Sequence, residues 1–172
     1  MASFDFTNFP RAGFIRRFAS WVYDVLLSIA IFMIAAYLGI GILIGLDSLI
    51  DFNSLSNYAF IRIDADINWK ESHVIYQLAF LTWSIAWVSY FFIFFWAKSG
   101  QTLGMKAWRL RLQNQDGSLI TKATGLKRLI PTLLGLGNFW LLFDRKNKLS
   151  LQDKITHTEV VILSLEANRG RL

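Results

Sequence analysis

The sequence has no cysteine, only two prolines and only two histidines among its 172 residues. Without cysteine, the chain can form neither a disulfide nor a thiolate metal site. The residue patterns of catalytic triads, paired catalytic carboxylates and clustered metal ligands are also missing from the sequence. These absences favour neither an enzyme nor a metalloprotein, and we expect no cofactor.

Charged residues are absent from residues 74–97, and Asp24 is the only one in residues 21–46. As helices that rise about 1.5 Å per residue, these apolar runs would reach roughly 36 and 39 Å, enough to cross a hydrocarbon core of about 30 Å. The run at 21–46 is too long for a secretory signal core, and Asp24 interrupts it, so we expect a retained anchor. The sequence therefore predicts a mostly α-helical membrane protein with two transmembrane helices.

Basic residues are scarce between the two runs. Residues 47–73 hold only two of the 18 Lys and Arg residues, together with five acids. Because basic loops stay in the cytoplasm, we expect both termini inside and residues 47–73 in an external loop. His73 and His157 then lie on opposite sides of the membrane and cannot share a metal. The net charge of +6 is expected to face anionic lipid, so the predicted partner is the bilayer and not nucleic acid.

The segment after the second run predicts a small cytoplasmic β element. Polar and apolar residues alternate over residues 108–113, and Asp116-Gly117 tolerates the positive φ angles of a tight turn. Residues 106–121 are therefore predicted to form a β-hairpin. Residues 158–165 predict a further strand that pairs with it, because two strands alone are marginally stable.

A third apolar stretch occupies residues 129–143. As a straight helix it would reach only about 22 Å, and Pro131 interrupts it. If it crossed the membrane, the basic residues that follow would lie outside, against the charge rule. We favour a re-entrant hairpin of two short helices in the inner leaflet, with a third full crossing as the alternative. Residues 144–172 are expected to be cytoplasmic, and residues 1–172 to form one membrane domain.

A stripe of polar residues follows one face of the first helix. It consists of Arg17, Ser20, Asp24 and Ser28. A carboxylate inside a membrane is costly, so Asp24 is expected to face protein and to have a basic partner. Arg17 begins about 10 Å away along the helix axis, and Arg145 or Lys148 could approach from the cytoplasmic segment. Two interpretations stay open: a structural ion pair, or a titratable carboxylate in a cation or proton path.

Two shorter motifs have structural interpretations. Gly41 and Gly45 have the spacing of small residues that lets helices approach closely, either against the second helix or in a homodimer. Ser150 and Asp153 have the spacing of a capping box at the start of a short helix.

Three segments together carry a family resemblance. They are RFASWVYD from Arg17 to Asp24, GQTLGMKAWRLRL at residues 100–112, and DRKNKLSLQDKITHT at residues 144–158, which contains Asp153. In this combination the sequence resembles the RDD family of small bacterial integral membrane proteins, named for one Arg and two Asp. The resemblance implies a bacterial inner membrane location and makes Arg17, Asp24 and Asp153 the candidate functional residues. Transport has been proposed for some members, including exchange of sodium or potassium for protons.

Two functions follow as hypotheses. The first is a cation or proton exchanger, which needs several subunits because two crossings cannot surround a pathway. The second is an accessory or scaffold protein whose basic cytoplasmic part, including Arg109 and Arg111, binds a partner or anionic lipid.

Overall fold

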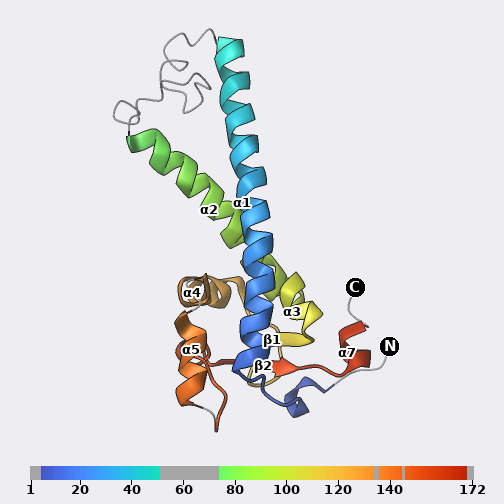
Figure 1. The fold of residues 1–172 in the computed structure, drawn as a ribbon. Coiled ribbons are helices and arrows are strands. Elements are labelled where there is room, and N and C mark those ends of the chain that lie inside the picture. Colours follow the sequence, from blue (N-terminus) through green and yellow to red (C-terminus); the bar gives the residue numbers. More distant parts are fainter. Residues whose placement is uncertain (1–4, 51–73, 134–135, 145, 170–172) are drawn as a thin grey trace. The chain divides into compact units, whose positions relative to one another are not determined.

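The computed structural model describes residues 5–50, 74–133, 136–144 and 146–169 (Figure 1). These residues are mostly helical and fall into two compact units. Unit 1 comprises Met1–Leu27 and Ser89–Leu172, and unit 2 comprises Ser28–Val88. The two long helices, α1 (Phe14–Ile50) and α2 (Val74–Ser99), each contribute to both units. The predicted single domain is therefore divided into two units.

Helices α1 and α2 contain the two predicted apolar runs. The segments Phe14–Ile42 and Phe80–Ser99 are long and apolar enough to cross a membrane. In their most apolar stretches only 6% and 22% of the residues are buried, unlike the core helix of a soluble protein. Large exposed side chains such as Ile34 and Leu38 are suited to lipid. The fold is that of a helical membrane protein. The predicted external loop follows the end of α1 in the sequence. Apart from its first residues, it lies outside the described residues.

In unit 2, α1 and α2 pack closely at Gly39. The Trp83 indole N–H of α2 donates to the Ala35 carbonyl at 3.0 Å. A Cβ at Gly39 would lie 3.2 Å from Trp83 Nε1, so glycine makes room for the indole. At Gly41, by contrast, a Cβ would meet no described atom within 4 Å. The predicted contact with the second helix is thus wrong for Gly41 and forms instead at Gly39, two residues earlier. Gly45 is on α1, but its surroundings lie outside the described residues.

Unit 1 contains an antiparallel pair of strands, β1 (Leu110–Asn114) and β2 (Thr158–Ile162). The late strand is therefore confirmed and pairs with the first, with Leu112 opposite Val160. The predicted hairpin at residues 106–121 is wrong. Its first arm begins with helix α3 (Leu103–Ala107), and the chain after the turn at Gly117 leaves the sheet. The edge of β1 away from β2 is occupied instead by Gly100, whose carbonyl accepts from the Leu112 N–H at 2.7 Å, and residues 119–121 form no strand.

The other edge of β2 is covered by the chain that leads into α1. The Ala12 N–H donates to the Val160 carbonyl at 2.8 Å, and the Ile162 N–H donates to the Pro10 carbonyl at 2.9 Å. Before this stretch lies the short 3-10 helix η1 (Phe6–Asn8), and Phe6 and Phe9 pack on a buried cluster of Val161, Leu163 and Ala167. The last of these belongs to helix α7 (Leu165–Arg169). The start of α1 is thus fixed to the sheet.

The third apolar stretch forms two short helices, as predicted, but the first begins earlier. Helix α4 (Lys122–Leu133) continues through Pro131, and α5 (Leu136–Phe143) follows it. Among the described residues, only α1 and α2 contain segments that could span a membrane. A third full crossing is therefore not supported. Helix α6 (Leu151–Thr156) then leads into β2, and Ser150 and Asp153 form the predicted capping box at its start.

The packing at Gly39 predicts a position-specific effect on stability. Gly39→Val would push Trp83 away from Ala35, and overpacking of this kind costs roughly 1–3 kcal/mol. We expect a lower thermal unfolding temperature for this variant in detergent. The matched variant Gly41→Val should unfold like the wild type, and equal destabilisation by both would contradict the observed packing.

Candidate functional site

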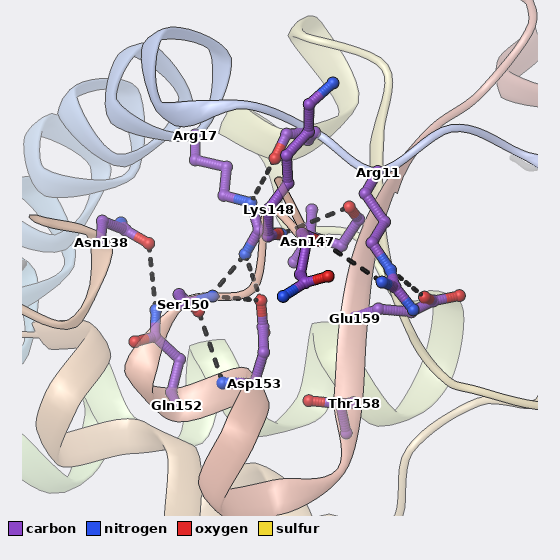
Figure 2. A network of polar contacts seen from close by, with 12 residues as sticks. Arg11, Arg17, Asn138, Asn147, Lys148, Ser150, Gln152, Asp153, Thr158 and Glu159 are labelled. Atoms are coloured by element: carbon purple, nitrogen blue, oxygen red, sulfur yellow. Dashed lines mark hydrogen bonds and ion pairs between the residues drawn. The ribbon is translucent and has the colours of Figure 1, made fainter. Parts of the chain in front are cut away.

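Arg17 occupies the first turns of α1 and is buried in unit 1. Its Nη1 donates to Asp153 Oδ2 at 2.5 Å and to Ser150 Oγ at 3.3 Å. The remaining donors reach backbone carbonyls, those of Ala12 at 3.0 Å and Lys148 at 3.0 Å. Figure 2 shows the guanidinium directed toward the start of α6. Arg17 therefore joins α1 to the distant C-terminal part of the chain.

Asp153 accepts from two arginines at once. Arg128 of α4 donates from Nη2 to Asp153 Oδ1 at 2.8 Å, while Arg17 occupies Oδ2. The Ser150 N–H also donates to Oδ2, at 3.1 Å, as part of the capping box. The second Arg128 nitrogen, Nη1, contacts the hydroxyls of Thr156 and Thr158. One carboxylate thus joins α1, α4 and α6, and we call Arg17, Arg128 and Asp153 the Arg–Asp–Arg cluster.

The side chain of Asp153 is fully buried, so its charge depends on the two arginines. Burial alone would raise the pKa of Asp153, but Arg17 and then Arg128 outweigh burial and lower this pKa to about 2. Burial also lowers the pKa of Arg128, and the adjacent carboxylate opposes that effect. Asp153 is therefore ionised at neutral pH, and the cluster has a formal charge of +1.

Asp24 is equally buried, at 4% exposure, but its observed hydrogen-bond donors are neutral. The Thr102 hydroxyl donates to Asp24 Oδ2 at 2.6 Å, and the Gly104 N–H donates to Oδ1 at 3.0 Å. Thr102 also caps α3, because its Oγ1 accepts from the Met105 N–H at 3.1 Å. A Cβ at Gly104 would lie 2.5 Å from the Ser20 carbonyl, so only glycine fits this close approach. Helix α3 thus presents its first turn to Asp24.

A cavity of about 60 Å³ lies inside unit 1, between these two groups of residues. Its polar lining comes from α1, α4, α5 and α6, and consists of Arg17, Ser20, Asp24, Arg128, Thr132, Asn138 and Gln152. Trp96 and Phe92 of α2 supply apolar walls. The volume is sufficient for a few water molecules or a small ion. With Asp24 ionised, the formal charges of Asp24 and the cluster sum to zero.

The predicted polar residues do not all meet at this site. Arg17, one of the three basic partners considered for Asp24, bonds Asp153. Lys148 contributes its carbonyl to Arg17, and its side chain is exposed. Ser20 is buried and lines the cavity, as the stripe predicted. Ser28 belongs to unit 2, and Arg145 lies outside the described residues.

Sequence reasoning missed Arg128, Thr102 and Gly104. Arg128 follows Lys127 in a helix with several polar residues. Only its burial in the fold distinguishes it from an exposed basic residue. The segment Gly100–Lys106 contributes one hydroxyl and one backbone N–H as hydrogen-bond donors to Asp24. Side-chain patterns in the sequence do not reveal such donors. In the sequence, only the glycine two residues after Thr102 marks this turn.

Two features define the class of this protein: two apolar helices able to span a membrane, and a buried Arg–Asp–Arg cluster at the base of the first. It is a small helical membrane protein with charged residues inside its fold. Residues 11–157 match the sequence model of the RDD family, which covers most of the chain, and the protein belongs to this family. Searches of curated proteins and of solved structures gave no match.

The cluster predicts that Asp153→Asn destabilises the protein strongly. The variant leaves two buried guanidinium groups without their anion, and breaking such a pair costs about 3–5 kcal/mol. Thermal unfolding in detergent measures the loss. Asp116→Asn, in an exposed turn, removes the same formal charge and should have little effect. Similar stability of the two variants would contradict the structural role of Asp153.

The pKa of Asp153 also predicts how stability depends on pH. Because this pKa is lower in the folded chain, at about 2, than the ordinary value of 3.8, folding favours the ionised form. Its contribution to stability is complete above the ordinary pKa and is lost as the pH falls toward the folded value. We expect the unfolding temperature to fall steeply between about pH 4 and pH 2. An unfolding temperature that is constant across this window would contradict the assignment.

Proposed function

We propose that this protein is one subunit of an oligomeric membrane carrier of protons or small monovalent cations, and that Asp24 takes up and releases the cargo. The observation that carries the proposal is the contrast between two buried carboxylates. Asp153 is held by two guanidinium groups, whereas Asp24 faces a cavity and is held by a hydroxyl and a backbone N–H. A hydroxyl and a backbone N–H can each bond a carboxyl group in either of its protonation states.

The hydrogen bonds around Asp24 accommodate both of its protonation states. When the carboxylate is ionised, Thr102 donates its hydroxyl proton to Oδ2. When a proton binds to the carboxyl, the Thr102 oxygen has a second lone pair to accept it while still accepting from Met105. The Gly104 N–H can keep its bond to Oδ1 in both states. Protonation would therefore turn the Thr102 hydroxyl hydrogen away from Asp24.

The charge of the cavity supports competition between cargoes. The formal sum of Arg17, Arg128, Asp153 and Asp24 is zero when both acids are ionised. Binding one proton or one monovalent cation gives +1, and binding both gives +2, which a buried site disfavours. A proton and a cation would therefore replace one another at Asp24, which is the requirement for exchange.

The membrane arrangement is part of the same proposal. Membership of the RDD family favours the bacterial inner membrane. The charge pattern favours two crossings, with both termini in the cytoplasm and the acidic residues 47–73 outside. Two crossings cannot enclose a pathway, so the carrier would be a homo-oligomer. Each subunit would then supply one Asp24 and one Arg–Asp–Arg cluster.

The alternative is an accessory protein that binds a partner or anionic lipid. Arg111, one of the two basic residues chosen for that role, is 2% exposed, and its guanidinium carbon lies 3.6 Å from the centre of the Phe6 ring. Its Nη2 also donates to the Gly117 carbonyl at 3.1 Å. Arg111 therefore stabilises the fold and is not available to a partner, which weakens this alternative.

Asp24→Asn tests the proposal directly. The amide oxygen can accept from Gly104 and the amide nitrogen can donate to Thr102, so we expect the variant to fold and to unfold near the wild-type temperature. In proteoliposomes, cation-driven pH changes should be lost in Asp24→Asn and kept in Asp116→Asn. Cross-linking in the membrane should show an oligomer for both variants.

Two results would contradict the proposal. The first is a wild-type protein that forms only monomers or produces no cation-dependent pH change. The second is an Asp24→Asn protein that unfolds readily, because that result would assign Asp24 a structural role.

A further inference from the structure

Helix α4 carries an exposed face that the Arg–Asp–Arg cluster does not use. Leu126 and Ile130 are 59% and 72% exposed and lie one turn apart on the same side of the helix. Exposed Lys122 and Lys127 lie on this face as well. Arg128, at 3% exposure, is on the opposite side and fixes which way the helix is turned. The exposed side therefore combines a short apolar stripe with two cations.

The packing of α4 sets its depth relative to the spanning helices. The Trp21 indole N–H of α1 donates to the Thr132 carbonyl at 3.1 Å. A Cβ at Gly125 would lie 3.7 Å from Ile93 of α2, so α4 contacts both helices. Trp21 is the first residue of the apolar run 21–46, and Ile93 lies about 6 Å inside the end of the run 74–97, at about 1.5 Å per residue. Helix α4 is therefore at the boundary between the apolar runs and the basic residues that flank them. Figure 1 shows α4 beside these ends of α1 and α2.

We propose that α4 is an interfacial helix, with Leu126 and Ile130 among the acyl chains and Lys122 and Lys127 at the phosphates of anionic lipids. At this depth an exposed apolar side chain meets lipid rather than water. Lysine side chains extend far enough to place their ammonium groups at the headgroups while their stems stay in apolar surroundings. Anionic lipid then supplies the charge that complements the two lysines.

This inference depends on α1 and α2 crossing the membrane and does not depend on ion transport. It also extends the membrane-embedded stretch expected at residues 129–143 back to the start of α4 at Lys122. The exposed face of α4 holds two lysines and two large apolar residues, a composition suited to a headgroup boundary. A second copy of the chain would bring the same lysines together, and their repulsion makes lipid the better occupant.

The absence of cysteine makes the depth of α4 measurable by single-site labelling. Leu126→Cys and Ile130→Cys would each carry a nitroxide label in proteoliposomes, with Ser118→Cys in an exposed turn as the aqueous control. We expect labels at 126 and 130 to collide with oxygen and to be protected from a water-soluble nickel complex. The label at 118 should show the reverse.

Two results would overturn the placement of α4. Nickel accessibility at 126 and 130 equal to that at 118 would place the face in water. Labels that are immobile and protected from both oxygen and nickel would place it against protein, either a second copy or a partner. Each result differs from a failed exchange assay, so the proposed transport function is tested separately.

The headgroup contact is tested with lipid mixtures. Spin-labelled phosphatidylglycerol should associate with the wild-type protein more than spin-labelled phosphatidylcholine does. The double variant Lys122→Gln/Lys127→Gln should lose much of this preference. The matched double variant Lys146→Gln/Arg169→Gln, which removes two exposed cations elsewhere, should keep it. An equal loss in both double variants would show a general charge effect and would overturn the assignment of the lysines.

Discussion

The fold of unit 1 depends on one buried carboxylate that two arginines share. Asp153 binds Arg17 through one oxygen and Arg128 through the other, and these three residues come from α6, α1 and α4. A carboxylate buried alone would be protonated or exposed to water, and each guanidinium alone would be costly to bury. Together they satisfy one another, so the start of α1, helix α4 and helix α6 assemble as one unit.

This constraint explains why the two acids of the family signature have different surroundings. Arg17 and Asp24 are on the same helix, and a direct contact between them would leave Asp153 with Arg128 and without Arg17. In the structure Arg17 instead donates to Asp153 of α6, and Asp24 accepts hydrogen bonds from Thr102 and Gly104 at the start of α3. The cavity is lined by Asp24 and by Arg17 and Arg128, the two arginines that bind Asp153.

Much of the fold could be predicted because it follows from local patterns. The apolar runs, the capping box at Ser150 and Asp153, the late strand and the paired short helices all depend on residues close in sequence. The partner of Arg17 could not be predicted, because Asp153 is distant in the chain and several bases and acids had similar reach. The hairpin was wrong for a related reason: β1 has a better partner in β2, and turn chemistry at Asp116-Gly117 does not decide between local and distant pairing. Thr102 and Gly104 act through a cap and a backbone N–H, which the sequence does not distinguish from an ordinary loop.

The central claim is that Arg17 and Asp153 act as a pair, and a double-mutant cycle tests it most directly. Arg17→Gln, Asp153→Asn and the double variant would be compared with the wild type by reversible unfolding in detergent. Residues in direct contact typically show coupling energies of about 0.5–3 kcal/mol. The account predicts a value at or above the upper part of that range, with the double variant little less stable than either single variant. Additive losses would contradict it, because they would mean that the two side chains contribute to stability independently.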